Sequence, residues 1–231
     1  ASVLGGLASA HLQQLQYATA RDLDLRALAI EQSIYGPEHP VIGDTFHDLA
    51  VAEKGLGQYD NALGYLRQAR AIFVAAYGER SKHVGMTDLT VGNSQLELGK
   101  LADARMTLER ASATLSATLP ADDSIIAHVE TILAVLDSQE GHCESAIPRS
   151  QRAIGIWERN GRGGPRLAIE LMNLGLCLTE VGRLTEARTA LERGISGLDA
   201  AGISELEHCR PWTALAELEW KEGHHARAIE R

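Results

Sequence analysis

A repeat of about 42 residues runs through the chain and constrains its fold more than any other feature. Glycines recur 42 or 41 residues apart at Gly57, Gly99, Gly141, Gly182 and Gly223. Alanines recur in the same register at Ala20, Ala62, Ala104, Ala146, Ala187 and Ala228. Because independent columns share one register, we divide the chain into units with approximate bounds 2–43, 44–85, 86–127, 128–168, 169–209 and an incomplete 210–231.

Each unit contains two helical patterns joined by a short turn. In the second unit, apolar and small residues recur at spacings of three and four, first at Phe46, Leu49 and Ala50, then at Ala62, Leu66, Ala69, Ile72 and Phe73. Gly57 lies between the two patterns and suits the left-handed end of a helix. Pro148 falls about one turn into a second helix, where the missing N–H costs little. We therefore expect helix pairs throughout.

One helix pair cannot bury its apolar face alone, so the pairs must stack to form a continuous core. The composition agrees with helices packed through small side chains, because 45 % of the residues are hydrophobic and only 4 % are aromatic. The sequence thus predicts an all-α fold, an α-solenoid built from one array of pairs. Since the chain begins without methionine and the sixth unit stops inside its second helix, we expect a fragment of a longer protein.

The charge of the chain argues against nucleic acid as a direct partner. Lys and Arg number 22 against 31 Asp and Glu, which gives a formal net charge of −9. The arginine pairs Arg67/Arg70 and Arg149/Arg152 lie three apart and are interpreted as solvated helix faces. Three cysteines without close spacing suit a cytoplasmic protein rather than a disulfide framework, and no stretch is long and apolar enough to span a membrane.

Several groups that resemble chemical sites are better explained by the repeat. Glu38 and His39 lie between two prolines and have no equivalent in later units, so His39 is expected to cap the following helix. Cys143 occupies a column that is otherwise apolar and should be a packed, inert thiol. The adjacent pairs His208-Cys209 and His224-His225 lack further ligands, and the stretch 160–165 lacks the Lys-Ser/Thr of a phosphate loop. The sequence therefore predicts no catalytic residues, metal or cofactor.

The chain resembles the tetratricopeptide repeat arrays of the 42-residue kind found in kinesin light chains. The resemblance rests on the stretches "YATARDLDLRALAIEQSIYGPEHP", "LGQYDNALGYLRQARAIFVAAYG", "LGKLADARMTLERA" and "VGRLTEARTALERGI". It implies a right-handed superhelix of antiparallel helix pairs that binds peptide segments in a concave groove and is not itself catalytic. The later junctions "LPADDS", "NGRGGP" and "DAAGIS" depart from the Gly-Pro-acid-His-Pro pattern, so turns of a different shape are expected there.

If the first helix of each pair lines the groove, the register selects the residues that a partner would contact. They combine amide, hydroxyl and aliphatic side chains, as an extended peptide requires. The set comprises His47, Asp48, Val51, Lys54, Leu89, Thr90, Asn93, Leu96, Thr131, Ile132, Val135, Ser138, Met172, Asn173, Leu176 and Thr179. Trp212 falls in the core-facing column of Phe46, whereas Trp220 could contact either a partner or a following helix.

The leading functional hypothesis is a non-catalytic protein- or peptide-binding scaffold module within a larger, bacterial signalling or regulatory protein. The alternative is a ligand- or peptide-sensing domain that controls an attached kinase or DNA-binding domain. An enzyme would need catalytic residues outside the sequence given. Self-association through the incomplete last unit is also open, because a second copy could cover its exposed pair.

Overall fold

The computed structural model describes residues 1–161, 164–202, 213, 215–216 and 218–220, and these residues form two compact units, Ala1–Leu119 and Pro120–Arg231. The first unit contains α1 (Ser2–Gln13), α2 (Tyr17–Tyr35), α3 (Pro40–Gly55), α4 (Tyr59–Tyr77), α5 (Lys82–Glu97) and α6 (Leu101–Thr118). The second contains α7 (Ser124–Gln139), α8 (Cys143–Arg159), α9 (Pro165–Glu180) and α10 (Leu184–Ala200). Over the described residues the secondary structure is helical, without β-strands, as predicted.

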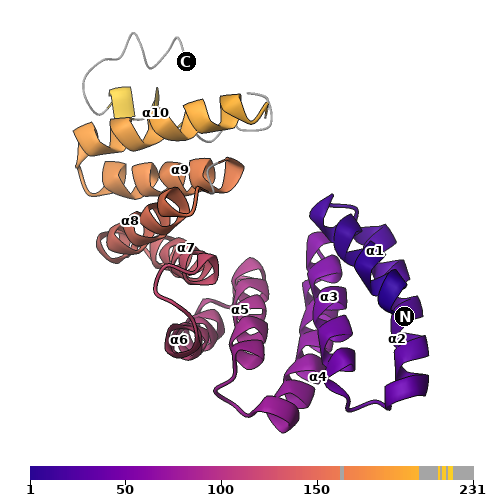
Figure 1. The fold of residues 1–231 in the computed structure, drawn as a ribbon. Helices are drawn as coiled ribbons and strands as arrows, with labels where there is room; N and C mark the ends of the chain where they lie inside the picture. The colour runs from indigo at the N-terminus through magenta and orange to yellow at the C-terminus, as the bar shows by residue number, and fades with distance from the viewer. Residues whose placement is uncertain (162–163, 203–212, 214, 217, 221–231) are drawn as a thin grey trace. The chain divides into compact units, whose positions relative to one another are not determined.

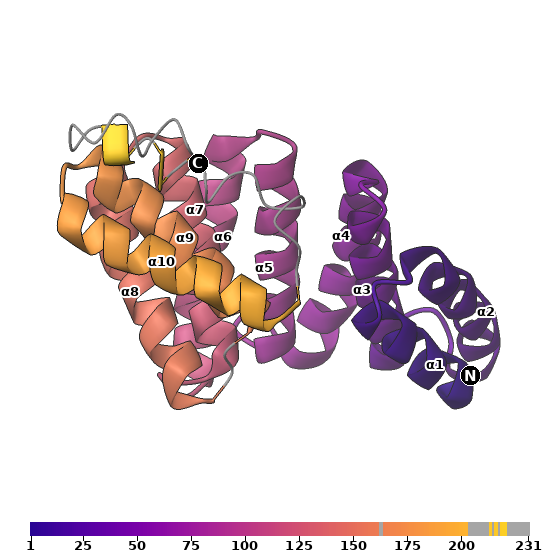
Figure 2. The same ribbon diagram turned by 90° about the horizontal axis from the view of Figure 1, so that it is seen from above.

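Consecutive helices pack as pairs, and the pairs stack within each unit (Figure 1). The pairs are α1 with α2, α3 with α4, α5 with α6, α7 with α8 and α9 with α10. Stacking contacts join α2 to α3 and α4 to α5 in the first unit, and α8 to α9 in the second. Figure 2 shows the same succession of paired helices from above. The predicted helix pairs are confirmed.

The same turn joins the two helices of each of the five pairs that have bounds here. Its N–H groups bond back across the helix end, as in Gln58 N to Glu53 O at 2.8 Å and Arg183 N to Leu178 O at 2.9 Å. The chain then needs one residue with positive φ, and Gly57 (74°), Gly99, Gly141 and Gly182 supply it. The first pair has Leu15 in this place, with φ 60°. The prediction for Gly57 is confirmed.

Small residues let the two helices of a pair approach closely. A Cβ added to Gly92 would lie 2.5 Å from Leu108 Cγ, and one added to Gly175 would lie 2.6 Å from Leu191 Cγ. Ala50 and Ala62 meet at the same place in the second pair and are completely buried. Any larger residue in these columns would push the helices apart.

The junctions between pairs fall into different types, as the sequence predicts. After α2 and α4 the chain turns at Gly36 and Gly78, whose φ values are 81° and 82°. After α6 it passes instead through Leu119 in an extended conformation. Pro40 starts α3 at its first position, and Pro148 lies inside α8, as predicted.

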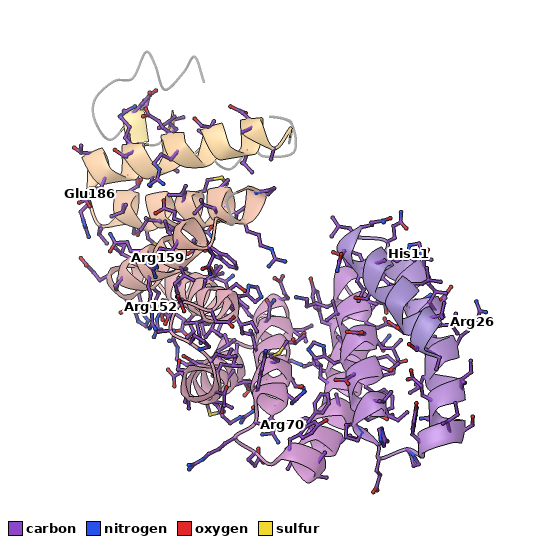
Figure 3. The ribbon with its side chains drawn as sticks, in the orientation of Figure 1. His11, Arg26, Arg70, Arg152, Arg159 and Glu186 are labelled. Atoms are coloured by element: carbon purple, nitrogen blue, oxygen red, sulfur yellow. The ribbon has the colours of Figure 1, made fainter. Side chains whose placement is uncertain are left out.

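Buried acidic residues tie neighbouring helices together through arginines. Asp88 on α5 accepts from Arg70 Nε and Arg110 Nε, both at 2.8 Å (Figure 3). Glu130 on α7 accepts from Arg152 Nη1 at 2.8 Å and from Arg149 Nη1 at 3.2 Å. The interpretation of these arginines as solvated faces is wrong for Arg70 and Arg149, which are themselves half-buried against acids that are almost fully buried. Arg152 also pairs with the buried Glu130, but its side chain is 51 % exposed, as predicted. Arg67 is exposed.

The predictions made for the sixth repeat, 210–231, fall almost entirely outside the described residues. Those for His208-Cys209, Trp212 and His224-His225 lie there as well. Of this part of the sequence, the structure places Trp220 in a helical segment with 56 % of its surface exposed.

Candidate functional site

In each unit, the first helices of successive pairs lie next to one another. In the first unit α3 contacts α5, and His47 Nε2 lies 3.2 Å from Thr90 Oγ1 across that contact. In the second unit α7 contacts α9. We name these two surfaces the α3–α5 face and the α7–α9 face, after the helices that carry the predicted groove residues.

The α3–α5 face presents a band of partly exposed polar side chains. His47, Asp48, Val51, Lys54, Thr90 and Asn93 are all half-buried. Leu89 and Leu96, also predicted to contact a partner, are only 6 % exposed each. They support the helices from beneath, so the accessible part of this face is mainly amide, hydroxyl, imidazole and carboxylate.

The α7–α9 face is more apolar. Thr131, Val135 and Asn173 are half-buried, while Ser138 and Leu176 are exposed. Met172 and Thr179 are buried, with 8 % and 6 % exposure, and Ile132 is buried too. Thr179 Oγ1 donates to the Gly175 carbonyl at 2.8 Å, which uses its hydroxyl within α9.

Negative charge gathers along the α3–α5 face. Burial raises the pKa of Asp44, and the carboxylates of Asp48 and Glu31 raise it further, while the imidazoles of His83 and His47 act in the opposite direction. A like-charge neighbour destabilises an ionised carboxylate, so this region is electrostatically suited to receive a cation. The sequence analysis named Asp48 but not Asp44.

Asp24 adds a buried carboxyl behind this face. Its side chain is 1 % exposed, and its Oδ2 has no hydrogen-bond partner among the described residues. Burial, followed by repulsion from Asp48 and Glu31, raises its pKa to about 7. The repeat register could have indicated that Asp24 is buried, because it occupies the same column as the core leucines Leu66, Leu108 and Leu191.

His39 and Cys143, two of the groups that resembled chemical sites, have the packing roles expected of them. His39 is the N-cap of α3, where its Nδ1 accepts from the Val41 N–H at 3.3 Å, and it stacks on Tyr35. Cys143 is buried, as is Trp157. Within the part of the chain that the structure describes, no three His, Cys, Asp or Glu side chains come together as metal ligands would.

Two open cavities of about 370 and 340 Å³ lie in the second unit, and the sequence analysis did not anticipate them. The larger lies between α9 and α10, and the smaller is shared by α8, α9 and α10. Arg193 borders both, and apolar residues such as Leu171 line them. No signal in the repeat register points to either cavity.

The paired helices, their stacking and the two exposed first-helix faces define the class of protein: an all-α solenoid of helix–turn–helix repeats. Such repeats generally present extended binding surfaces rather than catalytic centres. Among the described residues, no helix combines the length and the apolar character that a membrane crossing requires.

Comparison with known proteins identifies the repeat. The family model of the tetratricopeptide repeat matches residues 1–75. The Protein KINESIN LIGHT CHAIN-RELATED 1 of Arabidopsis thaliana is 24 % identical over 85 % of this chain, which spans 39 % of that relative's length. Residues 1–75 thus match the tetratricopeptide repeat, and the chain is similar to a kinesin light chain-related protein.

Solved structures share this fold at low sequence identity. BtubC (BKLC) from P. vanneervenii is 20 % identical, with a TM-score of 0.72 over 87 % of this chain and 81 % of its own. The Rap conjugation gene regulator of the plasmid pLS20, in complex with the Phr* peptide, is 18 % identical, with a TM-score of 0.72 over 96 % of this chain and 59 % of its own.

Proposed function

We propose that the array is a non-catalytic scaffold that binds extended protein or peptide segments on its α3–α5 and α7–α9 faces. The observation that carries the proposal is the band of partly exposed hydroxyl, amide and carboxylate groups on adjacent first helices. Such groups can bond the backbone of a peptide, while Val51, Val135 and Leu176 can contact its side chains.

The charge of the α3–α5 face indicates which segments it prefers. Asp44 is exposed and Asp48 has 41 % of its side chain exposed, so both can reach a ligand. We therefore expect a lysine or arginine of the bound segment to lie against these two carboxylates. The net charge of −9 also attracts positively charged segments electrostatically, and this attraction is strongest at low ionic strength.

The proposal is tested by selecting random twelve-residue peptides against the chain and measuring the affinity of the strongest by titration calorimetry. Asn93→Ala and Asn173→Ala remove one side-chain amide from each face. We expect the variant on the occupied face to weaken binding about fivefold, because a hydrogen bond to the ligand is worth on the order of 1 kcal/mol.

Exposed arginines on second helices supply the control. Arg67→Ala on α4 and Arg159→Ala on α8 should leave the affinity unchanged. Arg159 is labelled in Figure 3. Affinity that survives both asparagine substitutions but falls with either arginine substitution would place binding on the other side of the helix pairs and overturn the proposal.

We further propose that the array works within a larger bacterial signalling or regulatory protein. The fold likeness to the Rap conjugation gene regulator, which binds the Phr* peptide, supports the sensing alternative, in which a bound peptide controls an attached kinase or DNA-binding domain. Sequencing the gene on both sides of this stretch separates the two: a kinase or helix-turn-helix signature favours the sensor, and further repeats favour the scaffold.

A partner that covers the sixth repeat, including a second copy of this chain, is a further part of the proposal. Sedimentation at several protein concentrations tests it, because a self-associating chain shows a mass that rises with concentration.

A further inference from the structure

Two cysteines from different repeats meet in the core of the second unit. Cys143 is the first residue of α8 and Cys177 lies inside α9, 34 positions further along the chain, and their Sγ atoms are 3.0 Å apart. Both thiols are free and buried, with 8 % and 3 % exposure. Packed carbon atoms are optimally separated by about 3.5–4.0 Å, whereas a disulfide bond is about 2.05 Å long. The two sulfur atoms are thus about 1 Å from bonding distance.

We propose that Cys143 and Cys177 are a site of reversible oxidative modification, at which a peroxide forms a disulfide between α8 and α9. The bond would join the second helix of the fourth repeat to the first helix of the fifth. It would therefore add a covalent link at the joint between these two repeats, beside the packed cluster of Ala146, Leu174 and Leu178.

The repeat register shows that the pair is particular to this joint. The column of Cys143 holds Tyr59, Leu101 and Leu184 in other units. The column of Cys177 holds Ala52, Ser94, Leu136 and Leu218. The corresponding positions of the second and third repeats are thus Tyr59 and Ser94, which cannot be crosslinked. In the sequence, only the fourth and fifth repeats place sulfur at both positions.

The oxidation proceeds in two steps whose atoms balance. Cys143, the more exposed of the two, attacks one oxygen of the peroxide and becomes a sulfenic acid, releasing water from hydrogen peroxide. Cys177 then attacks the sulfenic sulfur, its proton leaves with the hydroxyl as a second water, and the disulfide forms. Two thiols and one peroxide give one disulfide and two waters.

The environment of Cys177 suits the second role rather than the first. Burial, the neighbouring Cys143 and the charge of Glu180 raise its pKa to about 12, so it remains a thiol at neutral pH. Cys143 is the more exposed of the two, so a peroxide reaches its sulfur first.

The test uses the full chain carrying Cys209→Ser, so that the third cysteine cannot take part. The protein is treated with hydrogen peroxide, its remaining thiols are alkylated, and its intact mass and tryptic peptides are measured. We expect the loss of two hydrogen atoms and a crosslink between the tryptic peptides 111–149 and 167–183, both reversed by dithiothreitol. The oxidised chain should also melt at a higher temperature, since the bond closes a loop in the unfolded state.

Cys143→Ser and Cys177→Ser supply the matched controls, and neither should change its melting temperature with peroxide. The proposal is overturned if both thiols of the treated chain remain free for alkylation after unfolding. It also fails if peroxide only adds oxygen to them, or if crosslinks join separate chains instead. If one serine variant does not fold, the peptide map of the parent protein still decides the outcome.

Discussion

Leu15 occupies a backbone conformation that every later described pair gives to glycine. Its φ is 60°, and the register places it in the column of Gly57, Gly99, Gly141 and Gly182. A left-handed conformation costs an L-residue with a Cβ roughly 1–2 kcal/mol. The backbone of the first repeat is therefore strained at Leu15. The glycines at the same position of the later repeats indicate that glycine would relieve this strain.

Leu15→Gly should stabilise the chain by about 1 kcal/mol, because the side chain is 69 % exposed and little packing is lost. Urea unfolding followed by circular dichroism measures the change. Ile34→Gly, at an exposed position within α2, is the matched control and should destabilise by a similar amount. If both substitutions lower stability, Leu15 is not strained.

Asp24 makes the stability of the first repeats depend on pH. Its pKa is about 7 in the folded chain against an ordinary value of 3.8, so the stability that it contributes is fully present below about pH 4 and is lost as the pH rises through 7. The groups that face it are Glu31 on its own helix and Asp48 on α3. Above pH 7 the charge of Asp24 therefore lies beside these two acidic side chains in a buried setting.

Asp24→Asn should remove this dependence. Wild type should lose on the order of 1–3 kcal/mol relative to the variant between pH 4 and pH 8, as denaturant unfolding at a series of pH values would show. Asp24→Leu, which introduces the residue type of the second, third and fifth repeats, should be more stable than wild type at pH 8. Parallel pH curves for wild type and Asp24→Asn would show that Asp24 does not titrate in this range.

Sequence reasoning succeeded at residues whose role is set by local geometry. Gly57 must adopt a positive φ, Ala50 must be small and His39 must stand before a helix, and each requirement can be read from the register. It missed Asp24 and the pairing of Cys143 with Cys177. Those depend on which side chains meet across different helices, and a single column does not contain that information.

At the scale of helices, buried charged residues replace apolar ones in the same repeat column. Like the apolar residues, they hold neighbouring helices together. The column that holds Phe46 and Leu171 holds Asp88 and Glu130 in the two repeats between them. Arginines 22 residues further along, Arg110 and Arg152, follow the acids and bond to them. Removing one partner would leave the other unpaired in a buried setting, which is costly.

Helix bounds were largely predictable because each helix ends at a marked position. Glycine ends several of them, proline starts α3 and α9, and Pro148 is tolerated near the start of α8. The pairing of Arg70 and Arg149 with buried acids was not predictable from spacing on one helix. An i, i+3 pair of arginines has the same appearance whether it faces water or a carboxylate on a neighbouring helix.

For the molecule as a whole, the repeat period predicts an array, and the resemblance to tetratricopeptide repeats implies a binding role, while the choice of ligand depends on the surfaces of the array. The α3–α5 face is acidic, with Asp44 and Asp48, and the α7–α9 face is more apolar, with Val135 and Leu176. A segment with basic and aliphatic residues would suit both. The cavities beside α10 are a separate feature of the second-helix side.

Hydrogen–deuterium exchange of the chain with and without a selected peptide tests the central claim most directly. The account predicts slower exchange on binding in peptides from α3 and α5, from α7 and α9, or from both pairs. Peptides from α4, α8 and α10 should be unaffected. Protection confined to these second helices, for example around the cavity lined by Ile154 and Ala190, would contradict binding by the first-helix faces.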